Sequence, residues 1–397
     1  MTSRALSFPA TLAAVALSMS ACGPGSSRSS AAAQAAAQQP ATADSTGGLY
    51  VQRNLVSDGA IPAEHVDQNL VNAWGIIHRG TSPWWVSDNG AGVSTLYDGE
   101  GVAQFGTPPL VVSVTGAGGG AAAPTGVVDN TGTGFVVSGG GAQEPAFFIF
   151  ASEDGTISGW NPNVPPPTPP ATRSTTTIVK VDESSSDPLG GAVFKGVTIA
   201  STSSGDRLFA TDFRGGRVAV FDDTFAPVST SGGFHDPNLP AGYAPFGIRA
   251  IDGTIYVTYA LQDAQKHDDV AGKHHGFVDA FSTDGVLLRR VASGGKLDSP
   301  WGLAMAPAEG FGRFDGKLLV GNFGDGHIVG YRAPGDDGDG GAYLTGKGGR
   351  ITIDGLWGLG FGNGAAAGPT NVLFFAAGPN GEADGLFGRI DFVPGRD

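Results

Sequence analysis

A bulky residue followed by glycine, and then by an apolar segment, recurs six times along the chain. The closest copies are Trp74-Gly75-Ile76, Phe246-Gly247-Ile248, Trp301-Gly302-Leu303 and Trp357-Gly358-Leu359, and the looser ones are Thr125-Gly126-Val127 and Lys195-Gly196-Val197. Successive glycines of this repeat are 51, 70, 51, 55 and 56 residues apart. A period of this length corresponds to one four-stranded blade of a β-propeller with its loops. The pattern therefore predicts six blades.

Each copy continues as further short strands. A second strand follows the anchor and ends in small and often polar residues before a glycine-rich turn, as at 208–212. A third strand alternates apolar and polar residues, as at 327–331, with the two-residue period of a half-buried strand. A weaker fourth strand follows most copies and is clearest at 176–181.

The two ends of the repeat region complement each other. The sixth copy ends at Phe392 and Val393 without a fourth strand, whereas a spare strand at 49–56 precedes the first copy. Pairing these segments would close the ring and remove both sheet edges. We therefore expect an all-β fold, a six-bladed β-propeller of four-stranded antiparallel blades closed by the N-terminal strand. It would form one domain over residues 49–397 with almost no helix. A β-sandwich or two stacked β domains is the alternative, and the regular spacing disfavours it.

The first 48 residues have a different character. Arg4 and an apolar run precede Met19-Ser20-Ala21-Cys22, which resembles a bacterial lipobox. We interpret residues 1–22 as a lipoprotein signal peptide, with lipidation at Cys22. An ordinary cleaved signal is the alternative. Residues 23–48 are rich in Ser, Ala and Gln, which predicts a disordered tether. The expected location is the cell envelope, in the outer membrane or periplasm of a Gram-negative host and at the cell surface otherwise.

Composition narrows the range of partners. The formal net charge is −14 and the chain has no cluster of Lys and Arg, so we expect no nucleic-acid partner. The 66 glycines are typical of many tight turns. Cys22 is the single cysteine, which rules out an internal disulfide and a cysteine-based metal site. We expect a monomer that contacts the membrane through its lipid and binds a protein, a small molecule or a carbohydrate.

Polar residues follow the second strands of several blades. In a propeller the loops after these strands lie on one face beside the central channel. Six residues are therefore predicted to converge there: Asp88, Asn89, Glu153, Asp154, Asp212 and Asn322. Of these, Asp88, Glu153, Asp212 and Asn322 are the predicted metal ligands. Oxygen ligands around one channel would attract a hard divalent cation such as Ca²⁺. The alternative is that each side chain caps its own turn.

The fourth copy carries an insertion at 260–275 with three of the seven histidines and three aspartates. We predict that His267, Asp268 and Asp269 transfer protons, because imidazole titrates near neutral pH. Neutral imidazole and carboxylate groups are also plausible ligands of Zn²⁺, Mn²⁺ or Fe. A solvated polar loop is the other alternative.

Three tryptophans stand where first strands begin. Trp74, Trp301 and Trp357 are predicted to line the channel mouth and stack on a sugar or an aromatic ligand. Packing between blades is the alternative.

Several strings resemble those of one family of bacterial exported proteins. They are QRNLVSD at 52–58, NAWG at 72–75, ASEDGTISGWN at 151–161, HDDVAG at 267–272 and SPWGLA at 299–304. The resemblance covers roughly residues 49–393. It implies a six-bladed propeller similar to the NHL-repeat and gluconolactonase-like superfamily, which includes calcium-dependent lactonases, lyases and binding modules. A fold shared by such different proteins does not choose a function.

Three functional hypotheses remain. The chain has no nucleophile elbow, phosphate-binding loop or dinucleotide fingerprint. The first hypothesis is therefore an envelope-anchored lipoprotein propeller that acts as a binding or protein-interaction module, with its ligand on the channel face. The second is a metal-dependent hydrolase, lactonase or lyase of the gluconolactonase-like type. The third is a purely structural envelope component.

Overall fold

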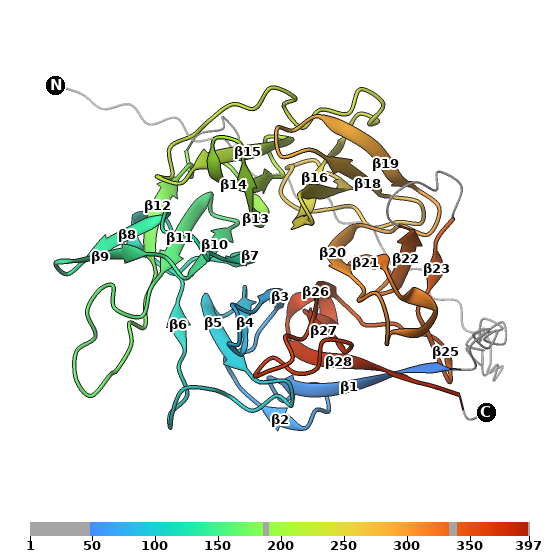
Figure 1. The fold of residues 1–397 in the computed structure, drawn as a ribbon, viewed down its shortest axis with the longest axis horizontal. Helices are drawn as coiled ribbons and strands as arrows, with labels where there is room; N and C mark the ends of the chain where they lie inside the picture. The colour runs from blue at the N-terminus through green and yellow to red at the C-terminus, as the bar shows by residue number, and fades with distance from the viewer. Residues whose placement is uncertain (1–47, 186–189, 333–339, 396–397) are drawn as a thin grey trace, which may run out of the picture. The chain divides into compact units, whose positions relative to one another are not determined.

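Six antiparallel β-sheets, one for each glycine anchor, stand around a central axis in the computed structural model of the chain (Figure 1). The structure describes residues 48–185, 190–332 and 340–395, which belong to one compact unit. The predicted six-bladed β-propeller is confirmed. The predicted signal peptide at 1–22, its Cys22 and, apart from Gly48, the tether at 23–48 lie outside the described residues.

The strands of the first three blades follow the chain. Blade one contains β3 (Ala73–Ile77), β4 (Trp84–Asp88), β5 (Val93–Tyr97) and β6 (Val112–Ser113). Blade two contains β7 (Pro124–Asp129), β10 (Phe148–Ser152), β11 (Thr156–Trp160) and β12 (Ile178–Asp182). Blade three contains β13 (Phe194–Thr202), β14 (Gly205–Asp212) and β15 (Arg217–Asp222).

The remaining blades complete the ring. Blade four contains β16 (Tyr243–Ile251), β17 (Thr254–Leu261), β18 (Phe277–Phe281) and β19 (Leu287–Ser293). Blade five contains β20 (Pro300–Met305), β21 (Lys317–Asn322), β22 (Ile328–Arg332) and β23 (Ala342–Tyr343). Blade six contains β26 (Leu356–Phe361), β27 (Leu373–Ala377), β28 (Leu386–Val393) and β1 (Leu49–Ser57). In the described part of the chain the single α-helix is α1 (Pro379–Glu382).

The ring closes through the N-terminal strand, as the sequence predicts. Strand β1 pairs antiparallel with β28, from Leu49 opposite Val393 to Ser57 opposite Leu386. The short β2 (His65–Val66) then adds to β1 in parallel. The first and last segments of the domain are therefore held in one sheet, which protects the backbone groups of both.

Blades two and three depart from the regular pattern. A hairpin of β8 (Val136–Gly139) and β9 (Ala142–Pro145) is inserted between β7 and β10, which accounts in part for the long interval between the second and third anchors. Blade three has three strands within the described residues, where four were expected. The segment after β15 contains Pro227, Pro237 and Pro240, and proline lacks the N–H that a ladder requires.

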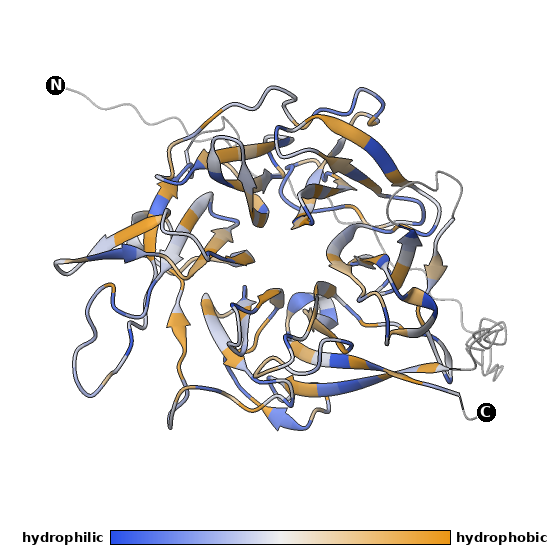
Figure 2. Ribbon diagram, in the orientation of Figure 1, coloured by the Kyte–Doolittle hydropathy of each residue, from blue (hydrophilic) through white to orange (hydrophobic). Residues whose placement is uncertain are grey.

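The hydrophobic core lies between the blades. Figure 2 shows hydrophobic residues concentrated in the strands and hydrophilic ones mainly in the connecting loops. Between blades three and four, for example, Phe209 and Val257 belong to one buried cluster that also holds Phe281. Each sheet thus buries both faces against its neighbours, and closure of the ring gives the last blade the same protection.

The anchor glycines allow the inner strands to approach one another. Strands β3, β7, β13, β16, β20 and β26 each contact the inner strands of the two neighbouring blades. A Cβ at Gly75 would lie 2.6 Å from the carbonyl oxygen of Thr125, and one at Gly126 would lie 2.6 Å from the amide nitrogen of Val197. Both distances are shorter than real Cβ contacts. The repeated glycine is therefore a steric requirement of the channel wall.

Candidate functional site

Charged and amide side chains from five blades meet at one end of the channel. Loops that join second to third strands lie at this end, as do the starts of the inner strands. We call the set the mouth, and its residues are Asn72, Asn89, Glu153, Lys195, His267, Asp268 and Glu382. Direct hydrogen bonds link all seven, so the mouth is one continuous polar network.

Lys195 stands at the centre of this network, at the start of β13. Its side chain is 2% exposed. The ammonium group donates to Oε1 of Glu153 and, at 3.4 Å, to Oδ1 of Asp268, and it lies 5.1 Å from the ring centroid of Trp74. Burial lowers the pKa of Lys195, but the negative charges of Glu153 and Asp268 more than offset it, so the pKa lies above its usual value. Lys195 is therefore a paired cation at the channel entrance.

The amide groups of Asn72 and Asn89 carry the network across the first blade. Asn89 donates to Oε2 of Glu153 at 2.9 Å, and Asn72 donates to Oδ1 of Asn89 and to Oε1 of Glu382, both at 3.2 Å. Burial raises the pKa of the Glu382 carboxyl. The mouth therefore holds three carboxyl groups around one ammonium group.

His267 and Asp268 lie in the insertion between β17 and β18. Asp263 accepts the backbone N–H of His267 at 2.8 Å and so fixes the turn that presents both residues. Nδ1 of His267 lies 2.8 Å from Oδ1 of Asp268. This hydrogen bond raises the pKa of His267 and lowers that of Asp268 to about 2. Because Asp268 is ionised at neutral pH, the proton belongs on Nδ1, which leaves Nε2 of neutral His267 as a proton acceptor.

The three predicted tryptophans come together directly behind the mouth. Trp74 and Trp357 stack with ring centroids 3.4 Å apart, and Trp301 meets both rings edge-on. Phe323 stacks on Trp357 at 3.9 Å. All three tryptophans are at most 9% exposed. Their rings pack on one another across the channel and form an aromatic layer. This is the packing between blades that was the alternative to a ligand-binding role.

The four predicted metal ligands do not meet in the described structure. Glu153 alone belongs to the mouth. Asp88 accepts the backbone N–H of Thr95 at 2.9 Å, Asp212 accepts that of Gly215 at 2.9 Å, and the amide of Asn322 donates to Oδ1 of Asp325 at 3.0 Å. These three are held within their own blades. Asp269, predicted to act with His267, has a buried Oδ2 without a partner, and burial raises its pKa.

A different set of residues has ligand atoms close enough for a metal ion. Glu153, His267 and Asp268 each place one such atom within 4.8 Å of the others. The ammonium group of Lys195 already binds the carboxylates of Glu153 and Asp268 from this position. A divalent cation between the same oxygens would meet that positive charge at short range. The arrangement fits a lysine ammonium group and does not fit an added divalent cation.

Comparison with known proteins gives two relatives of similar length. The "Uncharacterized protein R648" of Acanthamoeba polyphaga mimivirus is 31% identical over 343 residues, covering 85% of this chain and 78% of the viral protein. The "Uncharacterized protein L690" of the same virus is 31% identical over 346 residues, covering 85% and 84%. The chain belongs to their family. No family model matches the sequence.

Solved structures share the architecture of this family member. A Bacteroides thetaiotaomicron protein of unknown function has a TM-score of 0.52 at 10% identity, over 87% of this chain and 76% of that one. Virginiamycin B lyase from Staphylococcus aureus has a TM-score of 0.48 at 12% identity, over 87% and 100%. At 10% identity, the likeness to the Bacteroides protein shows the fold alone. The relatives named here are viral, so the expected bacterial exported family stays a prediction.

Sequence reasoning missed three members of the mouth as site residues. The repeat identifies Lys195 only as a loose copy of the anchor, and it gives Asn72 and Glu382 no role at the site. A signal for Lys195 was present, because a charged residue stood where the closest copies of the repeat have an aromatic side chain. Glu382 lies more than 300 residues from Asn72, and only the closed ring brings them together.

Proposed function

We propose that this propeller is an enzyme that catalyses a proton-transfer reaction, an elimination or a hydrolysis, on a small molecule at the mouth. The observation that carries this proposal is the hydrogen bond between Nδ1 of His267 and Oδ1 of Asp268. It orients the imidazole and leaves Nε2 as a general base. The ammonium group of Lys195 donates a hydrogen bond to the Asp268 carboxylate. This bond fixes the position of the carboxylate that accepts from His267.

The neighbours of His267 favour proton abstraction over covalent catalysis. Among the described residues its hydrogen bonds go to Asp263 and Asp268, and none joins it to a serine or threonine hydroxyl. A histidine that activates a side-chain nucleophile needs such a contact. His267 would instead remove a proton from the substrate, as in a lyase, or from a water molecule, as in a hydrolase.

The charge of the mouth favours neutral or cationic substrates. Glu153, Asp268 and Glu382 supply carboxyl groups, while Lys195 is the one lysine in the network. A mouth with this balance repels anions. The site does not favour a calcium-dependent lactonase, because Lys195 binds the carboxylate oxygens that the cation would need.

The test is a substrate screen with paired histidine variants. Purified residues 48–397 are incubated with panels of neutral lactones, esters and β-elimination substrates, and turnover is followed by mass spectrometry. We expect His267→Gln to reduce turnover about a hundredfold or more, the usual contribution of a general base. The control is His235→Gln, an exposed residue between β15 and β16, which should retain full activity. Equal turnover by His267→Gln and the wild type would rule out this role.

A second candidate function is an envelope-anchored binding module that uses the same mouth. It is supported by the lipobox-like Met19-Ser20-Ala21-Cys22 and by the absence of a serine or threonine hydroxyl on His267 in the described residues. Mass spectrometry of the mature N-terminus, with Cys22→Ser as the control, tests the anchor. A lipidated Cys22 combined with no turnover in the screen would favour this second function. A soluble chain that carries no lipid would reject it.

A further inference from the structure

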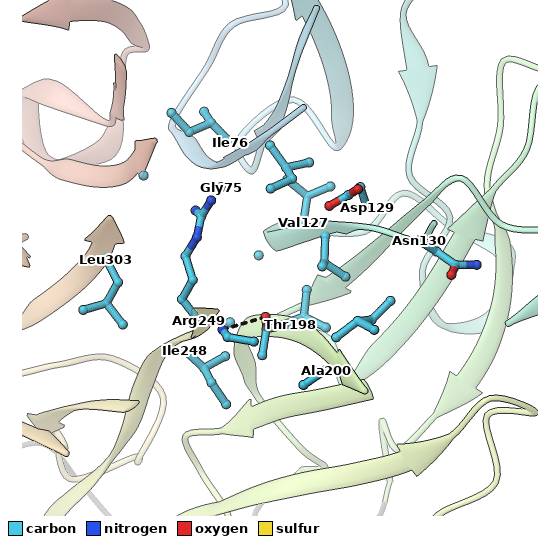
Figure 3. A pocket seen from close by; sticks show the side chains of 18 of the residues that line it. Gly75, Ile76, Val127, Asp129, Asn130, Thr198, Ala200, Ile248, Arg249 and Leu303 are labelled. Atoms are coloured by element: carbon cyan, nitrogen blue, oxygen red, sulfur yellow. Dashed lines mark hydrogen bonds between the residues drawn. The ribbon is translucent and has the colours of Figure 1, made fainter. Parts of the chain in front are cut away.

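The channel contains a second polar feature beyond the aromatic layer. A cavity of about 300 Å³ lies there between the inner strands of the blades (Figure 3). Its wall includes the residue that follows each anchor glycine, and these are Ile76, Val127, Val197, Ile248, Leu303 and Leu359. We call this space the lower cavity. It has room for a small organic molecule, and polar residues such as Thr198 and Asp129 line it beside these aliphatic side chains.

Arg249, on β16, extends into the lower cavity (Figure 3). Its Nη1 donates to the carbonyl oxygen of Leu359 at 3.2 Å, which is its one hydrogen bond to a described residue. No carboxylate of the described chain comes within 4.0 Å of its nitrogen atoms. A guanidinium group carries five N–H donors in a planar fork. Most of these donors therefore face the cavity without a protein acceptor.

The surroundings make an unpaired cation costly. Arg249 is half-buried, aliphatic side chains make up part of the wall around it, and burial lowers its pKa. The carboxyl groups of Asp129 and Asp206 also line the cavity; neither forms an ion pair with Arg249, although the charge of Asp129 acts on it at longer range and raises its pKa. Asn130 is already engaged, with its amide on the carbonyl oxygens of Gly134 and Ala146. An anion from outside the chain would satisfy Arg249 directly.

We propose that the lower cavity binds a small aliphatic carboxylate, with its oxygens on the Arg249 guanidinium and its carbon chain against the aliphatic wall. Carboxylate matches the guanidinium fork with two parallel hydrogen bonds. A single negative charge suits the cavity better than the double charge of phosphate, because Asp129 and Asp206 line the same space. This site is independent of the proposed activity at the mouth, from which the aromatic layer of Trp74, Trp301 and Trp357 separates it.

The test is calorimetric titration of residues 48–397 with butyrate, butyramide and inorganic phosphate at low ionic strength. Butyramide has the same shape as butyrate without its charge, and phosphate has charge without the aliphatic chain. We expect saturable millimolar binding of butyrate and at least tenfold weaker binding of the other two. No butyrate binding, or equal binding of butyrate and butyramide, would overturn the proposal.

Three variants locate the binding. Arg249→Met should abolish butyrate binding, and Arg249→Lys should weaken it severalfold because lysine keeps the charge without the fork. His267→Gln alters the mouth and should leave the affinity for butyrate unchanged. Circular dichroism checks that each variant is folded, and if Arg249→Met does not fold, Arg249→Lys decides the outcome. Butyrate binding that survives both Arg249 variants would place the anion elsewhere and reject the site.

Discussion

Lys195 and Arg249 are two cations of the same channel with opposite surroundings. They stand on the inner strands of adjacent blades, β13 and β16. Lys195 has two carboxylates within hydrogen-bonding range, whereas Arg249 has one backbone carbonyl oxygen and no carboxylate within 4.0 Å in the described chain. Lys195 is buried and Arg249 half-buried, and a charge withdrawn from water needs a counter-charge or hydrogen-bond partners. The mouth supplies carboxylate partners for Lys195 from the chain itself, whereas in the lower cavity a ligand would be the partner of Arg249.

The aromatic layer explains how one channel can hold both arrangements. The stacked rings of Trp74 and Trp357, with Trp301 edge-on to both, lie behind Lys195, and the residues after the anchor glycines line the space beyond. The residue before an anchor glycine, such as Trp74 or Lys195, thus belongs to the aromatic layer or the mouth. The residue after the same glycine, such as Ile76 or Val197, lines the lower cavity. The repeat therefore encodes the channel in layers.

The largest expected effect is that of removing the paired cation. Lys195→Met leaves Glu153 and Asp268 without their shared counter-charge, and we expect a loss of about 2–4 kcal/mol in the free energy of unfolding. The loss is moderated because Asp268 is 66% exposed and can be hydrated. Urea denaturation measures it, with the exposed Lys347→Met as the control. A loss no greater than that of the control would show that the network does not depend on Lys195.

The second prediction concerns the titration of the mouth. The folded-state pKa of His267 lies above its usual value, so its pairing stabilises the fold at pH below about 6.5 and is lost as pH rises through the folded-state pKa. The folded-state pKa of Asp268 is about 2, so its contribution is present above about pH 4 and is lost as pH falls through about 2. The pair therefore contributes most between these limits.

Asp268→Asn tests this pairing. It should lower the pKa of His267, because an amide does not stabilise the imidazolium ion as a carboxylate does. NMR titration of the imidazole proton resonances measures the change, with His267→Gln identifying the signal. The same titration of Asp269→Asn is the comparison, and a larger fall in that variant would assign the partner role to Asp269.

The sequence predicted the ring better than the site because the two depend on different information. The six glycine anchors reflect the close approach of the inner strands, and the spare strand at 49–56 reflects the unpaired edge of the last blade. Both features can be recognised in the sequence alone. The mouth depends on residues that the closed ring brings together, such as Asn72 and Glu382. Asp88, Asp212 and Asn322 share a repeat position with Glu153, but each side chain is held by a hydrogen bond within its own blade.

Arg249→Met should change the free energy of unfolding less than Lys195→Met does, and any change should be towards greater stability. No described carboxylate loses an ion-pair partner, and an aliphatic side chain suits the wall of the lower cavity, so the free energy of unfolding should change by less than about 1 kcal/mol or increase. The same urea denaturation measures it. A loss as large as that of Lys195→Met would mean that Arg249 already has a partner within the chain.

The smallest effect is expected when divalent cations are added to the wild type. The expected change in melting temperature depends on the ammonium group of Lys195. Ca²⁺ at the mouth must displace Lys195 from Glu153 and Asp268, so millimolar Ca²⁺ should shift the melting temperature of the wild type by less than about 1 °C. Lys195→Met frees two carboxylates and the nearby imidazole of His267, a set suited to Zn²⁺ or Mn²⁺. Zn²⁺ should therefore stabilise Lys195→Met more than the wild type. Differential scanning fluorimetry with and without EDTA measures both shifts. Strong stabilisation of the wild type by Ca²⁺ would mean that the ammonium group yields its place to a metal, and the calcium-dependent hypothesis would then regain its basis.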